Sequence, residues 1–148
     1  MSDPMNILIL SCGTRNKIVQ YFKKELGNKG KVMAADCSEL APALYDADKY
    51  FIVPRLDNNE YLDIVLSICK ENQVKGVISL IDPELSLLAK NKEKFLAIGT
   101  TPIISNYDIV EMCFDKYSLY LFLVNNGFKT IRSYIDKQKF YQDIENGV

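Results

Sequence analysis

One short turn, Ser-Cys-Gly-Thr-Arg at positions 11–15, has the clearest capacity for binding chemistry. Gly13 can let backbone N–H groups approach an anion at the start of the helix that follows. Arg15 can hold a carboxylate or a phosphate through two parallel hydrogen bonds. Because the turn has a single glycine, it is neither the three-glycine dinucleotide motif nor a Walker phosphate loop. The alternative to a binding role is a tight connection with a solvated arginine.

A second candidate stretch, Ile-Asp-Pro-Glu-Leu at positions 81–85, begins a helix. Asp82 is a favourable N-cap and Pro83 a favourable first helical residue. Glu84 lies where the helix dipole stabilises a negative charge. Helix-start chemistry therefore accounts for all three residues. In a doubly wound sheet this stretch would face positions 11–15 at the switch point, so we also predict that Arg15 and Glu84 line one crevice.

Two single residues have competing interpretations. Asp36 follows the apolar segment 31–35, where an acidic residue can bind a ribose hydroxyl, but aspartate also suits a turn or a helix N-cap. Lys116 begins a helix, where the dipole disfavours a cation, so a nearby phosphate would stabilise it. The alternative for Lys116 is a solvated ammonium whose stem lies over apolar neighbours.

The composition argues against several classes of protein. The 148-residue chain contains no histidine, which removes Ser-His-Asp and Cys-His nucleophile systems and argues against a zinc site. Its formal net charge is -1 without a basic tract, so we expect no nucleic-acid partner. No apolar run is long enough to span a membrane, so no membrane partner is expected. Residues 1–4 lack the features of a signal peptide and are expected to be a tag or disordered.

The four cysteines form no C-x-x-C pair. Such cysteines in or beside apolar segments are typical of reduced, mostly buried residues, so we expect a cytoplasmic protein. Cys12, which lies in the turn at 11–15, is the one expected to be accessible.

The elements that must position these residues alternate between strands and helices. Apolar runs without alternation favour strands that are covered on both faces. We therefore predict a three-layer α/β/α, Rossmann-like fold with a parallel sheet in the order 3-2-1-4-5. The expected strands are residues 7–10, 31–35, 49–53, 76–81 and 100–104, and the expected helices are residues 17–26, 39–46, 60–71 and one beginning at Asp82.

The C-terminal stretch has a different pattern. Helices are expected at 106–114, 116–126 and 136–145, with a further strand at 129–135. The helix at 116–126 is apolar nearly all round, and such a helix is normally buried on more than one side. We expect it either to expose an apolar patch or to be covered by self-association into a homodimer.

Four motifs, in this order, resemble a known family: the N-terminal, pre-ATP-grasp domain of ATP-grasp ligases, in particular the group similar to the carbamoyl-phosphate synthase large subunit. They are the turn at 11–15, the stretch at 81–85, Asp-Lys-Tyr at 115–117 and Asn-Gly-Phe-Lys-Thr at 126–130. The likeness spans residues 5–134. It implies a pre-ATP-grasp Rossmann-like domain at 5–114, followed at 115–148 by a linker helix and the start of an ATP-grasp domain.

The resemblance implies an enzyme that joins a carboxylate to an amine, a thiol or another nucleophile through an acyl-phosphate made with ATP and Mg²⁺. By this likeness Lys116 would reach the nucleotide phosphates. The residues bordering the small-molecule carboxylate or amine substrate would be Gly13, Thr14, Arg15, Asp82 and Glu84. The missing ATP-grasp domain, which holds ATP and Mg²⁺, would follow residue 148. This chain alone is therefore expected to have no catalytic or metal-ligating residue, no tightly bound cofactor and no activity.

Two alternatives belong to other classes of protein. A stand-alone Rossmann-like module could bind a small molecule or a nucleotide, although the second G-x-G that would favour it is lacking. A receiver-like regulatory domain would need an acidic pair after the first strand and a phosphorylatable Asp after the third. The sequence has Ser11-Cys12 and Pro54-Arg55 there, which argues against a receiver.

Overall fold

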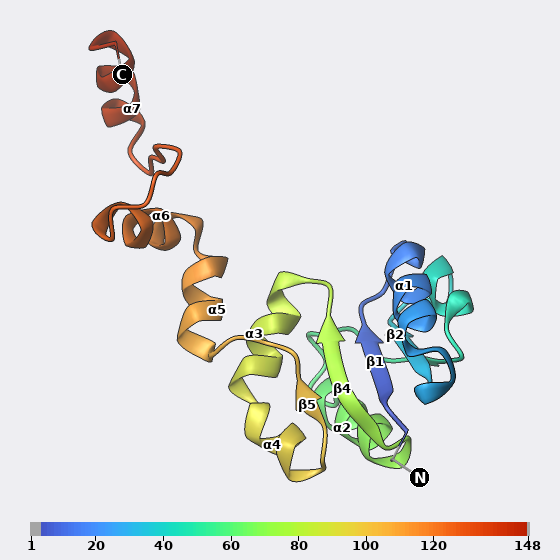
Figure 1. Ribbon diagram of the computed structural model, residues 1–148. Helices are drawn as coiled ribbons and strands as arrows, with labels where there is room; N and C mark the ends of the chain where they lie inside the picture. Colours follow the sequence, from blue (N-terminus) through green and yellow to red (C-terminus); the bar gives the residue numbers. More distant parts are fainter. Residues whose placement is uncertain (1–3, 148) are drawn as a thin grey trace. The chain divides into compact units, whose positions relative to one another are not determined.

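A computed structural model describes residues 4–147 of the chain (Figure 1). The chain forms two compact units, the first ending at Asn106 and the second beginning at Tyr107. The domain boundary predicted at residue 114 stays a prediction, because a division into compact units does not test it. Each unit is described by itself.

The first unit is built on a parallel sheet of five strands in the order β3-β2-β1-β4-β5. The predicted α/β fold, with its strand order, is therefore confirmed. All five residues of β1 are buried, which explains why the central strand is apolar without alternation. The strands are β1 (Asn6–Leu10), β2 (Val32–Asp36), β3 (Lys49–Ile52), β4 (Val74–Ser79) and β5 (Thr101–Pro102).

Helices cover both faces of this sheet (Figure 1). The sheet separates the core into two clusters of buried residues. Leu8 and Leu10 of β1 contribute to the cluster with helices α2, α3 and α4, while Ile7 and Ile9 contribute to the cluster with α1 and η2. Alternate side chains of one strand thus stabilise opposite layers. The helices are α1 (Asn16–Leu26), η1 (Gly27–Lys29), η2 (Pro42–Asp46), α2 (Tyr61–Glu71), α3 (Asp82–Lys90) and α4 (Lys92–Ala97).

The helix predicted at 39–46 is a shorter 3₁₀-helix, η2, with Pro42 as its first residue. Proline has no N–H to donate and its fixed φ suits the first position of a helix. The helix therefore begins at Pro42, whereas residues 39–41 precede it as a turn.

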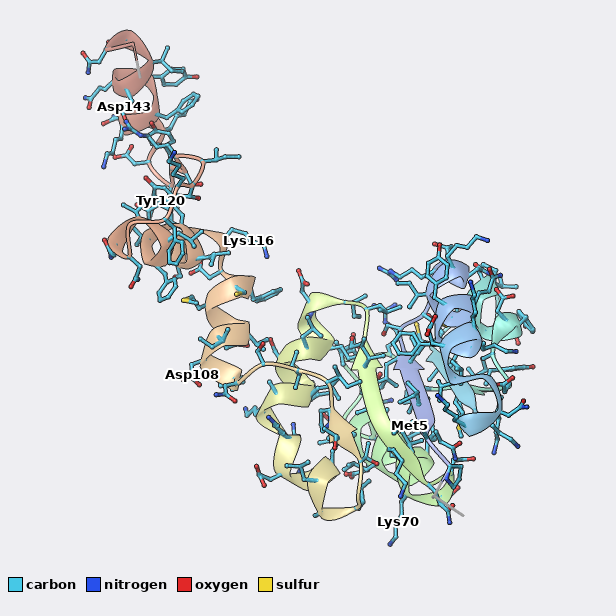
Figure 2. The ribbon with its side chains drawn as sticks, in the orientation of Figure 1. Met5, Lys70, Asp108, Lys116, Tyr120 and Asp143 are labelled. Atoms are coloured by element: carbon cyan, nitrogen blue, oxygen red, sulfur yellow. The ribbon has the colours of Figure 1, made fainter. Side chains whose placement is uncertain are left out.

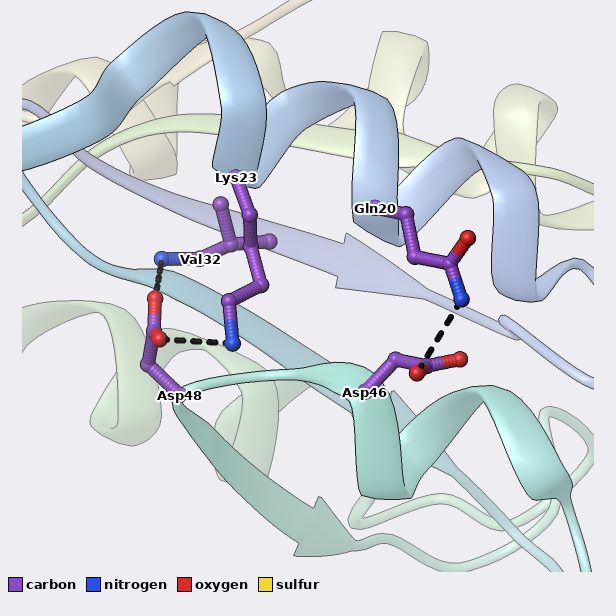
Figure 3. A network of polar contacts seen from close by, with 5 residues as sticks. All are labelled: Gln20, Lys23, Val32, Asp46 and Asp48. Atoms are coloured by element: carbon purple, nitrogen blue, oxygen red, sulfur yellow. Dashed lines mark hydrogen bonds and ion pairs between the residues drawn. The ribbon is translucent and has the colours of Figure 1, made fainter.

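Two carboxylates hold α1 in place beside η2 and β2. Asp46 accepts hydrogen bonds from the amides of Asn16 (2.6 Å) and Gln20 (3.2 Å). Asp48 accepts from the ammonium of Lys23 (2.9 Å) and the backbone N–H of Val32 (2.8 Å), as Figure 3 shows. Because α1 begins at Asn16, these bonds also fix the position of the turn at 11–15.

The second unit contains α5 (Tyr107–Phe114), α6 (Lys116–Asn125) and α7 (Lys137–Glu145). Asp115 caps α6 by accepting from the backbone N–H groups of Tyr117 and Ser118. Asp136 caps α7 in the same way. None of the residues of α6 is buried, and the apolar side chains of Leu121 and Phe122 are exposed. Within this single chain the helix exposes apolar surface, which is the first of the two predicted outcomes, while self-association into a homodimer stays a prediction.

The prediction of a strand at 129–135 is wrong. Within the described residues, this segment is irregular and the second unit contains no strand. Ile131 and Ile135 are 87% and 76% exposed, so its apolar residues have neither a ladder nor a core to join. Instead, Arg132 and Tyr134 each donate a 2.8 Å hydrogen bond to Asp143 of α7.

Candidate functional site

The turn at 11–15 leaves β1 through backbone conformations that favour glycine. Ser11 has a φ of 46° and Gly13 a φ of 50°. For a residue with a Cβ this left-handed region is higher in energy by about 1–2 kcal/mol, so Ser11 needs interactions with its neighbours that stabilise it there. Such strain persists only where the surrounding structure over-determines the backbone, and it is common at functional sites.

Bonds from β2 and η2 hold the middle of the turn. The N–H of Gly13 donates to Oδ2 of Asp36 at 2.8 Å, and the carbonyl of Gly13 accepts from the N–H of Ala43 at 3.1 Å. The other oxygen of Asp36, Oδ1, accepts from the N–H of Ser38 at 3.0 Å. These contacts favour the turn-residue interpretation of Asp36 over a bond to a ribose hydroxyl.

The outer part of the turn remains open to solvent. Thr14 and Arg15 are exposed, and Nη1 of Arg15 donates to the carbonyl of Ser11 at 3.2 Å. Arg15 occupies the N-cap position of α1 without a side-chain capping bond. The first turn of α1 therefore presents backbone N–H groups next to a guanidinium group, a combination that suits an anion.

Glu84 lies on the inner side of the same region and is fully buried, with 0% of its surface exposed. Its Oε1 accepts hydrogen bonds from the hydroxyls of Ser11 (3.1 Å) and Tyr61. Its Oε2 accepts from the hydroxyl of Ser79 at 2.5 Å. Burial raises the pKa of Tyr61, and the charge of Glu84 together with this hydrogen bond raises that pKa further.

The carboxylate of Glu84 therefore joins the ends of β1 and β4 at the switch point of the sheet. Hydrogen bonds to a charged group contribute about 1.5–3 kcal/mol each, enough to offset the backbone strain at Ser11. Arg15 and Glu84 both contact Ser11, one at its carbonyl and the other at its hydroxyl. Because Glu84 has no exposed surface, it contacts the turn from the interior of the protein. The exposed Arg15 contacts the turn from the solvent side.

Asp82 does not cap α3, although the sequence favoured that role. The N-cap position is held by Ile81, and no side chain makes a capping bond there. Asp82 is exposed at the first position of α3. Its carboxylate is therefore available at the same edge of the sheet as Arg15.

Lys116 turns back from α6 to the preceding helix (Figure 2). Its Nζ donates to the carbonyl of Cys113, near the end of α5, at 2.7 Å. The C-terminal end of a helix dipole attracts cations, so this contact relieves the unfavourable placement that the sequence suggested a phosphate would relieve. The side chain remains exposed.

The expectation that Cys12 is accessible is wrong. Cys12 is 0% exposed and packs in the α1 side of the core, and burial raises the pKa of its thiol to about 11. Cys37, directly after β2, is the exposed cysteine at this edge of the sheet. Ser11, directly before Cys12, has a positive φ, a local conformation that the sequence pattern did not indicate.

Two further observations concern the described residues, 4–147. No group of three Cys, Asp or Glu residues among them has the arrangement of a metal site. None of their helices is long and apolar enough to cross a membrane.

A model of one protein family matches most of the first unit. The family is described as the PylC-like, N-terminal domain, and the match covers residues 7–103. These residues include both the turn at 11–15 and the stretch at 81–85. A comparison with curated protein sequences gave no match.

Solved structures share the fold at low sequence identity. N5-carboxyaminoimidazole synthetase from Staphylococcus aureus, complexed with ADP, is 16% identical, with a TM-score of 0.63 over 99% of this chain and 37% of the other. An L-amino acid ligase from Bacillus licheniformis is 20% identical, with a TM-score of 0.62 over 88% of this chain and 32% of the other. A pyruvate carboxylase from Rhizobium etli is 19% identical, with a TM-score of 0.59 over 88% of this chain and 13% of the other.

This chain therefore spans little more than a third of the length of the N5-carboxyaminoimidazole synthetase and a smaller share of the other two proteins. The predicted resemblance to the N-terminal domains of ATP-grasp ligases is confirmed at the level of the fold. On the family match, which covers more than half of its length, the chain belongs to the PylC-like N-terminal domain family.

Proposed function

We propose that this chain is the substrate-side, N-terminal domain of an ATP-grasp ligase that joins a carboxylate to an amine or a similar nucleophile. The observation that carries the proposal is the connection between the turn at 11–15 and the start of α3. Glu84 accepts hydrogen bonds from Ser11 after β1 and from Ser79 at the end of β4. Doubly wound sheets bind ligands at this switch point, and the family match includes both segments.

The exposed groups at this point have complementary chemistry. Arg15 and the first N–H groups of α1 suit the carboxylate of a substrate, and Asp82 suits an amine. Gly13 and Thr14 complete the border between them. In this proposal Glu84 contributes from inside the fold, since none of its surface is exposed.

Lys116 is proposed to contact the phosphates of ATP. Its ammonium is exposed and bound by one carbonyl, that of Cys113, so it can exchange that contact for a more strongly charged one. ATP and Mg²⁺ would supply the phosphoryl group and its electrostatic stabilisation. We propose that both are held chiefly by an adjoining ATP-grasp domain.

Alone, the 148-residue chain is proposed to be inactive. Acyl-phosphate formation requires a carboxylate held in line with ATP and a metal ion spanning its phosphates. Mg²⁺ prefers an octahedral set of oxygens that usually includes one or two carboxylates. Arg15 and Lys116 can each provide a charge contact, and an exposed ion pair contributes only about 0–1 kcal/mol.

A titration of the isotope-labelled chain, followed by the NMR shifts of its backbone amides, tests the ligand chemistry. Acetate and inorganic phosphate should shift the amides of residues 13–17, with dissociation constants in the millimolar range, and Arg15→Ala should abolish these shifts. Shifts unaffected by Arg15→Ala would contradict the proposed site. Binding of ATP at micromolar concentrations would instead favour the alternative, a stand-alone nucleotide-binding module.

A further inference from the structure

The buried carboxylate of Glu84 is held by hydroxyl groups from separate elements. Ser11 follows β1, Tyr61 begins α2 and Ser79 ends β4, whereas Glu84 itself lies in α3. A buried carboxylate is costly unless hydrogen bonds satisfy it. An apolar residue of similar volume often stabilises such a position equally well, so stability alone does not account for a carboxylate here.

The bond from Ser11 connects this buried cluster to the exposed surface. Ser11 has a φ of 46°, in the left-handed region that disfavours most residues with a Cβ. Its hydroxyl is bound by Glu84 and its carbonyl accepts from Nη1 of Arg15. The orientation of Ser11 thus determines where the residues that follow it leave the sheet.

We propose that Glu84 is a positioning residue that holds Ser11 in its left-handed conformation and so presents Thr14 and Arg15 to the substrate. The inference rests on the proposed function only in its last step, the contact of Thr14 and Arg15 with a ligand. Glu84 itself does not touch that ligand. The same carboxylate fixes the start of α2 through Tyr61, so three turns at the ligand-binding edge share one anchor.

Amide hydrogen exchange of the 148-residue chain tests the positioning step. In Glu84→Gln and in Ser11→Ala, the amides of Cys12, Gly13 and Arg15 should exchange at least tenfold faster than in the original chain. Alanine keeps a Cβ at position 11, so Ser11→Ala removes the bond to Glu84 without relieving the backbone. It also serves as the second variant if Glu84→Gln fails to fold.

Thr100→Val is the matched control for a loss of stability without a loss of positioning. Thr100 is 0% exposed, and its hydroxyl donates to the carbonyl of Val74, at the opposite end of β4, at 2.8 Å. Once exchange is normalised to that of β1 amides, this variant should leave the amides of the 11–15 turn unchanged. If Glu84→Gln and Ser11→Ala then match Thr100→Val, Glu84 is a core group only and the proposal is overturned.

A second readout separates positioning from simple loosening. The acetate and phosphate titrations should give at least threefold weaker binding in Ser11→Ala than in the original chain, whereas Thr100→Val should bind as the original does. Equal binding by Ser11→Ala and the original chain would overturn the proposal. If the original chain binds neither probe, the proposed ligand site fails, and the exchange rates still decide whether Glu84 positions the turn.

Discussion

The two units of this chain differ in how their apolar residues are used. In the first unit, every residue of β1 is buried, and two clusters pack against opposite faces of the sheet. In the second, Val110 is the one buried apolar residue among those described. Its large apolar side chains that stay exposed include Phe114, Leu121, Phe122, Phe128, Ile131 and Ile135.

The helices of the second unit are also short, with 8, 10 and 9 residues. Isolated helices shorter than about 12–15 residues are marginal in water. Asp115 and Asp136 cap two of them, and caps typically contribute about 1 kcal/mol each. The comparison indicates that the first unit carries most of the stability of this chain, while the second leaves apolar surface exposed.

Truncating one phenylalanine in each unit should give the largest difference in stability between the two units. Phe95 is 0% exposed in the core of the first unit, and Phe122 is 43% exposed in α6. Phe95→Ala should lower the free energy of unfolding by about 3–5 kcal/mol, while Phe122→Ala should change it by less than about 0.5 kcal/mol. Urea denaturation followed by circular dichroism measures both. Equal losses would show that α6 belongs to the same cooperative core.

Glycine substitutions give a smaller test of the same difference. Gly13 and Gly127 both have positive φ, at 50° and 74°, so alanine adds about 1–2 kcal/mol of strain at either. Gly13→Ala should lower the free energy of global unfolding by that amount, since its turn is bonded to β2 and η2. Gly127→Ala should leave the global transition unmoved. A destabilised sheet in Gly127→Ala would contradict the division into units.

The dependence of stability on pH should show the smallest effect. Hydrogen bonds from the amides of Asn16 and then Gln20 lower the pKa of Asp46. Burial raises the pKa of Asp48, but the bonds from Lys23 and from the N–H of Val32 outweigh burial and lower it.

Because the folded pKa values of these carboxylates lie below their unfolded values, their stabilisation is present above the unfolded pKa of about 3.9. It is lost as the pH falls through the folded values. The urea concentration at the unfolding midpoint should therefore decrease as the pH is lowered below about 4. In Asn16→Ala this decrease should be smaller. Acid sensitivity unchanged by Asn16→Ala, measured by urea midpoints at a series of pH values, would count against a role for Asp46.

The sheet could be predicted from sequence because its signals are local. Apolar runs without alternation marked the covered strands, and the alternation of strands and helices with right-handed crossovers favoured a doubly wound order. The segment at 129–135 was also predicted to be a strand, but it is irregular and pairs with none of the strands among the described residues. Pairing depends on a partner elsewhere in the molecule, which local pattern does not supply.

The site was only partly predictable, since its decisive contacts join distant residues. The sequence suggested the stretches 11–15 and 82–84 as candidates, but it did not indicate that the hydroxyls of Tyr61 and Ser79 bind Glu84. One signal was available: Glu84 and Leu88 are four residues apart and share a helix face, and both are buried. Tyr61 and Val65 have the same spacing, and a buried tyrosine usually needs a partner for its hydroxyl.

Lys116 illustrates what spacing does not reveal. Its position at the start of α6 was correctly predicted. The contact of its ammonium with the carbonyl of Cys113 depends on the angle between two successive helices. That angle is set by tertiary packing, so the electrostatic argument from sequence identified a problem without its solution.

The most direct test of the proposed function is a comparison of ATP turnover by two proteins. One is this 148-residue chain, and the other is the same chain extended by whatever coding sequence follows Val148. With Mg²⁺ and a pool of amino acids, the extended protein should convert ATP to ADP in an acceptor-dependent way, and the 148-residue chain should not exceed a buffer control. Turnover by the 148-residue chain that disappears in Lys116→Ala, or a stop codon directly after Val148, would contradict the account.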